Sequence, residues 1–548
     1  YFEQDDILIA LSAEAASELD QRKIKYKTLQ ENYYSHKDYI KIVKDLEEQL
    51  IEIINNFDYA LENFDEKFKK TNIKTFYKFI YFFKFLFDSI RVKIFELNNL
   101  FQMEEINKVK FFKVYNEPIN QFYHYFDSDS IYQLLLKDMS KKYKFRIVEI
   151  EVGNKTVKKA SLKSFIIKYI RLLKIKNNIS LRGIIKKNNK SLLSVNCLEF
   201  ENVENVFIEN GWTVKHFPKI NTIDKKDKIF AKNFLEEISK DKTIIGAFEF
   251  QEFNFFELIK NRVNYFSQDL NSILKYYNKL NSYMEKNKFD IVFFHTLTPF
   301  KPEAVLLPLI CQNKKIPYVC WTHGAAGNNK TLSGYKFSDH LFGQHYFVYG
   351  EVYRKLLNEF HSNFKLITHT IGSAILNKRY LNYKAPNNKR KIITVVVGPT
   401  GNKNLHHLFD DKYYRFDYYF PLKKVLEVLS KFSKKYKIII RLHNDDKQKY
   451  IINNILKLYN VQDIELMDTK EISFDKVVKF SDLFINFWLS TTFYEQCFSH
   501  ADIFMLNESD LTRQTKETLT NRAYYFENFD SFTKNLNKYL DEGIFYKK

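Results

Sequence analysis

The chain has 548 residues and an apolar fraction of 45%, which predicts a globular protein with two large domains or three smaller ones. Its formal net charge of +20 predicts an anionic partner, which could be a nucleic acid, an anionic membrane surface or a phosphorylated substrate. Arginine clusters interleaved with aromatic residues are not evident, so we do not expect nucleic acid. Lysine-rich solvated faces are the simpler alternative explanation of the charge.

The cysteines and the apolar runs bear on the cellular compartment. Four cysteines are scattered without a C-x-x-C pair, so we expect reduced thiols of a cytoplasmic protein and no zinc site. The sequence contains no run of 18 or more apolar residues, so we expect no transmembrane helix, and no signal peptide is visible. The nearest candidate, 76–101, is interrupted by charged residues such as Lys84 and Asp88. We interpret it as a core helix, and an amphipathic helix lying on a membrane is the alternative.

The first half of the chain opens with a β-α-β pattern and then turns helical. We interpret about 39–105 as a helical insertion, after which strands and helices alternate. Expected strands are 6–11, 24–27, 145–150, 192–195, 289–295 and 316–320, and expected helices are 12–21, about 225–288 and 302–313.

A second alternating series follows a polar run rich in lysine and asparagine. Its expected strands are 391–397, 437–442, 483–486 and 503–506, and its expected helices are 419–435 and 529–540. Strands alternating with helices predict doubly wound parallel sheets, so the fold class is α/β with two Rossmann-like domains facing across a cleft. The predicted domains are an N-terminal domain over 1–376, a linker over 377–390, a C-terminal domain over 391–528, and a helix in 529–548 that packs back.

The strand-like segment 316–320 leads directly into Trp321-Thr322-His323-Gly324, a histidine in a loop of small residues. Such loops let a substrate approach the backbone closely, and ligands bind at the carboxyl ends of strands in α/β sheets. His323 is therefore the first candidate for a catalytic group, and a structural histidine is the alternative. Glu303, which opens the helix after His295, is a candidate acidic base, although a first-turn helix residue explains it as well.

Three loops of the second domain follow predicted strands and carry groups that suit an anionic ligand. Arginine, histidine and lysine contact phosphate, and a helix N-terminus opened by hydroxyl residues favours it. Each loop by itself is also explained as an ordinary turn or helix cap, and the glycine spacing of the first does not match a P-loop. The candidate donor-binding residues are Gly398, Thr400, Gly401, Lys403, Arg441, His443, Ser490, Thr491, Thr492 and Glu495.

The acidic triplet Asp127-Ser128-Asp129 has the D-x-D form of a metal-nucleotide site. It precedes an apolar helical pattern, so helix capping is the simpler interpretation. We therefore expect no metal site.

The order of these motifs resembles bacterial GT-B glycosyltransferases and related transferases of surface polymers. The resemblance rests on the Trp321–Gly324 loop, the Ile371-Gly372-Ser373 turn, Arg441-Leu442-His443 and the helix start at Ser490-Thr491-Thr492 with Glu495. One similar branch is the teichoic-acid glycerophosphotransferases, with a W-H-G-[ST] loop. The other is the capsule and lipopolysaccharide transferases that use CMP-activated Kdo or sialic-type sugars. The sequence departs from these patterns by the added Thr322 and by Asn444, where the family usually has proline.

The resemblance implies transfer of a sugar from a nucleotide-activated donor to a glycan or lipid-linked acceptor, without metal or cofactor. His323 would act on the acceptor beside Gly324 and His295, the basic and hydroxyl residues of the second domain would stabilise the leaving phosphate, and Glu495 would hold the ribose. We expect CMP-Kdo or another CMP-activated sugar acid as the donor. We expect the protein in the cytoplasm or at the inner face of the cytoplasmic membrane. The alternatives are a CDP-polyol phosphotransferase, a UDP-sugar epimerase and a non-catalytic scaffold that binds polyanions or lipid headgroups.

Overall fold

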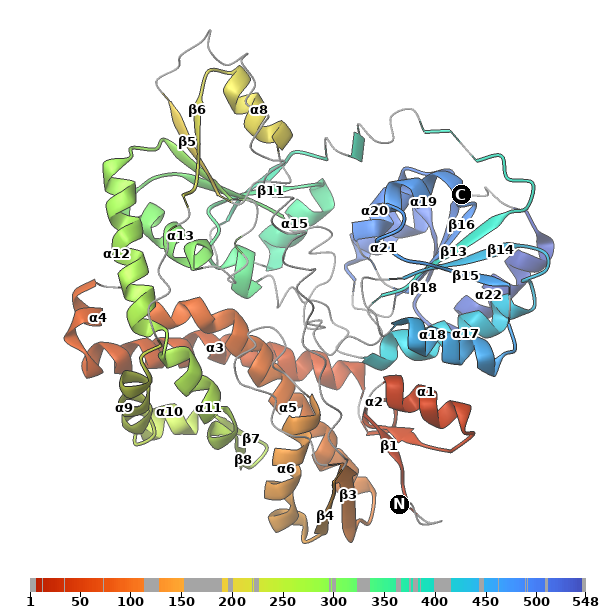
Figure 1. The fold of residues 1–548 in the computed structure, drawn as a ribbon, viewed down its shortest axis with the longest axis horizontal. Coiled ribbons are helices and arrows are strands. Elements are labelled where there is room, and N and C mark those ends of the chain that lie inside the picture. The colour runs from red at the N-terminus through yellow and green to blue at the C-terminus, as the bar shows by residue number, and fades with distance from the viewer. Residues whose placement is uncertain are drawn as a thin grey trace.

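The computed structural model contains two six-stranded parallel sheets, which lie in the two halves of Figure 1. It describes residues 6–544 apart from residues 12, 34, 72, 113–127, 152–189, 196–200, 219, 221–225, 295–296, 298–301, 323–335, 361–365, 374–375, 378–382, 385, 399–414, 443–447, 462, 488, 490 and 508–510.

The N-terminal sheet has the strand order β12-β11-β10-β9-β5-β6. The first strand in sequence, β5, therefore has β6 on one side and β9 on the other, and the chain changes direction across the sheet between β5 and β9. Helices α8 (Glu201–Glu209), α13 (Glu303–Lys314) and α15 (Glu351–Phe360) connect its strands. The strands are β5 (Ser191–Val195), β6 (Thr213–His216), β9 (Ile291–Phe294), β10 (Tyr318–Trp321), β11 (His345–Val348) and β12 (Ile367–Thr370).

The C-terminal sheet has the order β15-β14-β13-β16-β17-β18, with its change of direction between β13 and β16. This is the strand order of a dinucleotide-binding Rossmann sheet. Two Rossmann-like domains are thus confirmed, whereas the cleft between them stays a prediction. The strands are β13 (Ile392–Val396), β14 (Lys437–Arg441), β15 (Ile464–Met467), β16 (Leu483–Asn486), β17 (Asp502–Leu506) and β18 (Tyr524–Phe526), and the helices are α17 (Arg415–Ser430), α18 (Gln448–Leu458), α19 (Phe474–Phe480), α20 (Thr491–Cys497), α21 (Arg513–Arg522) and α22 (Phe529–Glu542).

The predicted helical insertion is helical and shares one hydrophobic core with the N-terminal sheet. We call 36–103 the helical layer. It comprises α3 (His36–Phe64), α4 (Glu66–Thr71), η1 (Thr75–Phe79) and α5 (Ile80–Met103). The neighbouring elements are β3 (Lys108–Phe112), α6 (Ser128–Tyr143), β4 (Arg146–Ile150), α9 (Lys228–Ile238), α10 (Lys242–Gly246), β7 (Glu249–Phe250), β8 (Phe253–Asn254), α11 (Phe256–Ser267) and α12 (Leu270–Lys286).

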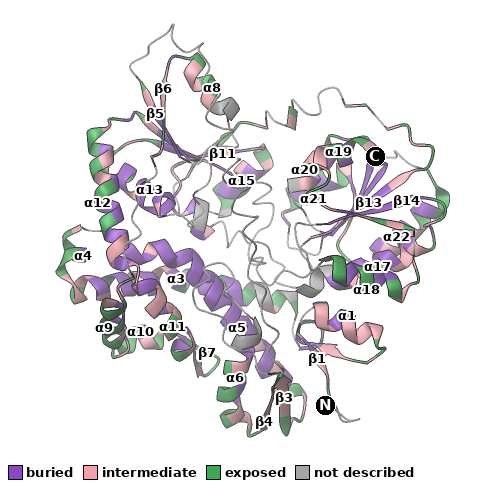
Figure 2. Cartoon of the chain, in the orientation of Figure 1, coloured by how far each residue is buried: buried purple, intermediate pink, exposed green. Residues whose placement is uncertain are grey.

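Helix α5 is buried around most of its circumference, as Figure 2 shows. Even Lys84 and Asp88 are 1% exposed, and their side chains form an ion pair of 2.5 Å. The interpretation of this segment as a core helix is confirmed, because the helix keeps no apolar face that could lie on a membrane. None of the helices in the described ranges is both long and apolar enough to span a bilayer.

The first elements form a small unit of their own, residues 6–33, which we call the N-terminal unit. It contains β1 (Ile9–Ala10), α1 (Ala13–Gln21), β2 (Lys27–Thr28) and α2 (Leu29–Tyr33). The predicted β-α-β order is confirmed, but β1 and β2 pair only with each other, outside both large sheets. Helix α1 packs into the core of the C-terminal domain. This placement differs from the predicted N-terminal domain, which took in all of 1–376.

The predicted C-terminal helix and the predicted linker both contact the C-terminal domain. The apolar stripe of α22, which includes Phe532 and Leu536, packs into that domain's core beside α17. The predicted packing back is thus onto its own domain. In the predicted linker, the Tyr383 hydroxyl donates to the Val478 carbonyl over 2.9 Å, and Asn388 Nδ2 donates to Asp482 over 2.7 Å.

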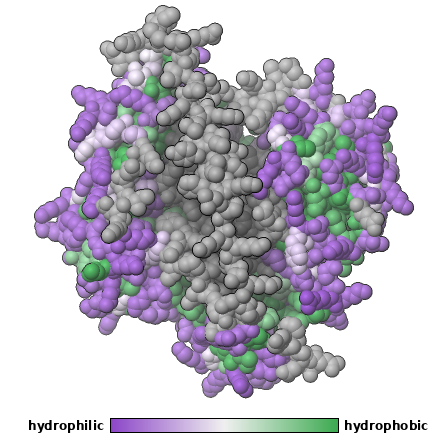
Figure 3. Space-filling view, in the orientation of Figure 1, coloured by the Kyte–Doolittle hydropathy of each residue, from purple (hydrophilic) through white to green (hydrophobic). Residues whose placement is uncertain are grey.

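Hydrophilic side chains cover most of the described surface in Figure 3. A hydrophobic patch lies over α6 and the β3–β4 pair, where Phe112 is 50% and Leu134 is 42% exposed.

Candidate functional site

The three central strands of the C-terminal sheet end at the same level. Val396, the last residue of β13, is in register with Arg441 at the end of β14 and with Asn486 at the end of β16. All three are parallel, so the loops that follow them leave the sheet at one edge. The order in which the chain adds strands reverses between β13 and β16. Open α/β sheets bind their ligands at the carboxyl edge beside such a switch point.

The loop after β13 starts at Gly398, directly beyond Val397, whose N–H donates to the Arg441 carbonyl over 3.2 Å. Gly398 therefore lies beside the end of β14, as the prediction of one shared site requires. The other predicted residues of this loop, Thr400, Gly401 and Lys403, lie outside the described residues.

Arg441 lies at the end of β14, as predicted, and its side chain is engaged within the protein. Its side chain is 4% exposed, and its two terminal nitrogens donate to the carbonyls of Asp468 over 2.7 Å and Ile472 over 2.5 Å. Burial lowers the pKa of the guanidinium, while the nearby acidic side chains of Asp468 and Glu471 oppose that shift. The guanidinium thus fixes the turn after β15, and the expected contact with a phosphate stays a prediction. His443 lies outside the described residues.

The loop after β16 leads into α20 through a buried amide pair. Asn486 Nδ2 donates to Gln496 over 2.7 Å, and Gln496 Nε2 donates back to Asn486 over 3.0 Å. Both residues are at most 1% exposed, so the pair fixes α20 against the end of β16. Thr492 and Glu495 on this helix are half-buried, whereas Ser490 and the side chain of Thr491 lie outside the described residues.

Arg522 fixes the other end of α20. Its guanidinium donates to the carbonyls of Gln496 over 3.2 Å, Ser499 over 2.8 Å and Ala501 over 3.0 Å. Sequence reasoning missed Arg522 and the Asn486–Gln496 pair. Asn486 could have been found from the sequence, because it is a polar residue at the end of an apolar strand. The sequence around Gln496 and Arg522 gives no comparable signal.

The N-terminal sheet also has a level edge. Phe294, the last residue of β9, is in register with Val195 on β5 and with Cys320 on β10. In the sequence His295 follows Phe294 directly, and His323 comes three residues after Cys320. His295, His323 and Gly324 all lie outside the described residues, so their place at this edge stays a prediction.

The residues just before His323 belong to the sheet. Trp321 packs against Phe293 and Phe347 at ring-centroid distances of 6.4 and 5.8 Å. The N–H of Thr322 donates to the Phe347 carbonyl over 3.0 Å, and its side chain is fully buried. The tryptophan of the predicted motif is thus part of the core, and its packing sets where the loop begins.

Glu303 lies in the first turn of α13 within a buried ionisable cluster. It is 9% exposed and accepts a hydrogen bond of 3.0 Å from the Tyr276 hydroxyl on α12. Lys78 of the helical layer is 5% exposed; burial lowers its pKa to about 7, and the charges of Glu303 and Asp269 oppose that shift. Burial and the Glu303 carboxylate raise the pKa of Tyr276. Glu303 is thus buried and engaged by the Tyr276 hydroxyl, and its role as a base stays a prediction.

The D-x-D triplet is described only in part. Helix α6 begins at Ser128, as the capping interpretation expects, and Asp127 lies outside the described residues. Within the described part of the chain, no three histidine, cysteine or acidic side chains come together in a way that could hold a metal ion.

Comparison with known proteins finds likeness only among solved structures. No family model and no curated protein matches the chain. A UDP-N-acetylglucosamine 2-epimerase from Listeria monocytogenes is 11% identical with a TM-score of 0.38, over 64% of this chain and 88% of that one. A glycosyltransferase from Rickettsia africae is 15% identical with a TM-score of 0.34, over 65% and 88% of the two chains. MurG from Acinetobacter baumannii is 11% identical with a TM-score of 0.33, over 65% and 93%. The fold described above rests on the strand orders of the two sheets and not on these distant likenesses.

Proposed function

We propose that this protein is a glycosyltransferase that takes a nucleotide-activated sugar as its donor. The observation that carries the proposal is the register of the C-terminal sheet. It brings the ends of β13, β14 and β16 to one edge, beside the point where the strand order reverses. Three loops chosen from the sequence for their affinity for phosphate therefore start beside one another, where α/β sheets hold nucleotides.

In the proposed mechanism the donor binds at the C-terminal edge and the acceptor at the N-terminal edge. The basic and hydroxyl side chains of the donor loops stabilise the charge that develops on the leaving phosphate. Because Arg441 is engaged with backbone carbonyls, this task falls on Lys403, His443 and the residues that open α20. Glu495 holds the ribose, and no metal or cofactor is required.

On the acceptor side, His323 takes the proton from the acceptor hydroxyl while the new glycosidic bond forms. A positioned base of this kind contributes about 10²–10⁴-fold to the rate. Glu303 is the alternative base. The Tyr276 hydroxyl donates to its carboxylate, and its negative charge acts on the buried Lys78.

The finer proposal is a CMP-activated sugar acid such as Kdo, transferred to a glycan or lipid-linked acceptor. The net charge of +20 supports a lipid-linked acceptor at an anionic membrane surface. Binding of the full chain to anionic vesicles at low salt, with none to neutral vesicles, is the expected result; no binding to either would remove the membrane part of the proposal.

A thermal-shift screen with CMP, CDP, UDP, GDP and ADP tests the proposal. Saturable stabilisation by CMP supports a sugar-acid donor, and stabilisation by CDP supports the polyol phosphotransferase instead. UDP as the stabilising nucleotide leaves a UDP-sugar transferase and the epimerase, which are separated by whether the UDP-sugar is consumed without an acceptor. Stabilisation by none of the five, together with salt-sensitive binding of polyanions, would replace the enzyme by a scaffold.

A further inference from the structure

The N-terminal unit contacts both large domains, and its buried hydrophobic residues divide between two hydrophobic cores. On the side of the C-terminal domain, Ala10, Ala13 and Ala16 are at most 2% exposed and pack into that domain's hydrophobic core. Alanines at positions 13 and 16 share one face of α1, so this helix approaches α17 and α18 closely. The first half of the unit is therefore seated on the C-terminal domain.

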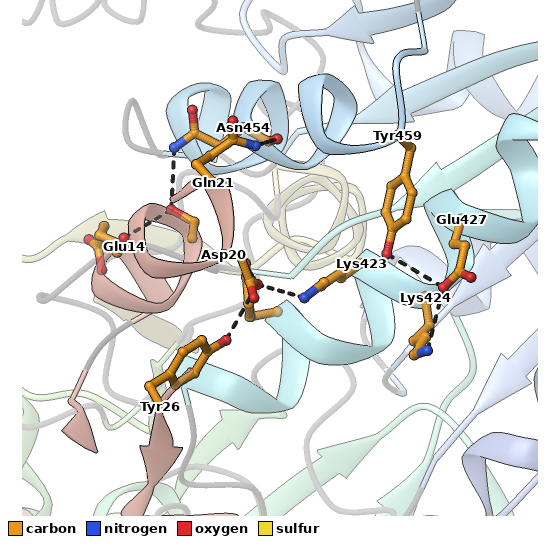
Figure 4. Close-up of polar contacts among 11 residues, drawn as sticks. Glu14, Asp20, Gln21, Tyr26, Lys423, Lys424, Glu427, Asn454 and Tyr459 are labelled. Carbon is orange, nitrogen blue, oxygen red and sulfur yellow. Dashed lines mark hydrogen bonds and ion pairs between the residues drawn. The ribbon is translucent and has the colours of Figure 1, made fainter. Parts of the chain in front are cut away.

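Polar contacts hold α1 in this seat, as Figure 4 shows. One oxygen of Asp20 accepts a hydrogen bond from Lys423 on α17 over 2.6 Å. The same oxygen accepts from the Tyr419 hydroxyl, also on α17, over 2.5 Å. On α18, the Asn454 carbonyl accepts from Gln21, and the Asn454 side chain donates to Ser17 over 3.4 Å. These contacts run from one face of α1 to two helices, which fixes its orientation.

The second half of the unit is seated on the helical layer. Leu29 and Tyr33 are at most 4% exposed and belong to the core of the N-terminal domain. Glu104, at the end of α5, accepts from Lys27 over 2.5 Å and from the Tyr33 hydroxyl over 2.8 Å. Asn99 of α5 also donates to the Tyr33 carbonyl over 2.7 Å.

Residues 22–26 connect the two halves along the chain, and the parallel pairing of β1 with β2 joins them as well, with the N–H of Lys27 donating to the Leu8 carbonyl over 2.8 Å. Helix α1 ends abruptly, because the N–H of Ile24 donates to the Leu19 carbonyl over 2.9 Å and the N–H of Lys23 to the Asp20 carbonyl over 3.0 Å. This is a Schellman end, and Lys23 has the left-handed φ of 56° that usually falls to glycine. A pocket of about 480 Å³ lies at this joint, between the unit and Phe420 of α17. The connection is thus short, and the pairing of β1 with β2 makes the two anchored halves one unit.

We propose that the N-terminal unit is an interdomain clamp, which holds the C-terminal domain at a fixed distance and orientation from the helical layer. The linker provides one connection between the domains, and the clamp provides a second on another side of the C-terminal domain. Two connections oppose the rotation that one flexible linker would allow. Small alanine contacts and solvent-accessible ion pairs can separate without exposing a large core, so the clamp limits domain opening and can release it. This inference concerns domain motion and does not depend on the proposed reaction.

Small-angle X-ray scattering of the full chain tests the clamp with Asp20→Ala, Glu104→Ala and the double variant. Each single variant is expected to increase the radius of gyration, and the double variant is expected to increase it no further, because cutting either end releases the same clamp. Glu465→Ala is the matched control, since its ion pair of 2.8 Å with Lys437 lies within the C-terminal domain. It is expected to leave the radius at the wild-type value.

An unchanged radius in Glu104→Ala would overturn the proposal, because it would mean that the unit only decorates the C-terminal domain. Additive increases in the double variant would also overturn it. If Asp20→Ala fails to fold, Lys423→Met cuts the same contact from the C-terminal domain without altering the unit, and the same outcomes decide.

Discussion

The carboxyl edges of the two sheets are both formed by level strand ends, but different side chains hold them in place. At the C-terminal edge, a neutral amide pair and two arginines bound to carbonyls fix the ends of the strands and α20. At the N-terminal edge, the first turn of α13 lies in a cluster of a carboxylate, a phenol and a buried lysine whose pKa is about 7. Amides and arginines keep their charge state at all ordinary pH values, whereas burial lowers the pKa of Lys78 in the second cluster to about 7.

We expect from this difference that the C-terminal domain binds the nucleotide and the N-terminal domain carries out the proton transfer. A site that binds a nucleotide needs fixed geometry, and the C-terminal edge has contacts that do not change with pH. A site that moves a proton needs groups that titrate near the working pH. The following predictions test this division, from the largest expected effect to the smallest.

Replacing His323 by alanine is expected to lower kcat by about 10²–10⁴-fold, because the acceptor's proton loses its base. The dissociation constant of the donor nucleotide is expected to stay unchanged, since the donor site lies on the other domain. Steady-state kinetics and calorimetric titration of the nucleotide measure the two quantities. His369→Ala, which removes an exposed histidine of the same sheet, is the control. Full turnover in His323→Ala would move the base to Glu303 or elsewhere.

Replacing Arg441 by methionine is expected to lower the free energy of unfolding by about 3 kcal/mol, because two hydrogen bonds from a charged donor are lost. Urea denaturation measures this loss, and Arg513→Met, whose side chain is 92% exposed, is expected to change little. A variant that kept its stability but lost nucleotide affinity would return Arg441 to the phosphate site.

Replacing Lys78 by methionine is expected to flatten the pH dependence of stability. Burial lowers the pKa of Lys78 from 10.5 to about 7, so the stability linked to its neutral form is present above pH 10.5 and is lost as the pH falls toward 7. Between pH 7 and 10 the wild type should therefore gain on the order of 3 kcal/mol relative to Lys78→Met. Urea denaturation at both pH values measures the gain. Equal slopes in the two proteins would mean that Lys78 is not held in its neutral form.

Replacing Glu495 by glutamine is expected to raise the KM for the donor about tenfold, because a charge-assisted contact with the ribose becomes a neutral one. The effect on kcat should be smaller, in contrast to His323→Ala. Glu517→Gln on the exposed face of α21 is the control. An unchanged KM would place the ribose away from α20.

Local sequence was sufficient for the elements that are long or strongly apolar. The helical insertion over about 39–105, the core helix within 76–101 and the buried strands β13, β14 and β16 were predicted, since each has a clear period or apolar run. The short, partly exposed strands β6, β12 and β18 were not predicted. Their residues alternate weakly because edge strands have one neighbour and keep polar side chains.

The sequence by itself therefore determined the two alternating α/β series, the strand ends that bear polar loops, and the helical nature of 36–103. Only the tertiary structure decided which polar residues are engaged by the protein itself, as Arg441 is, because a guanidinium at a strand end suits a phosphate and a backbone turn equally well. It also decided that the N-terminal unit packs on the distant C-terminal domain rather than within a sheet of its own half. That contact joins residues more than 400 positions apart, such as Asp20 and Lys423, and no local period or motif records such a pairing.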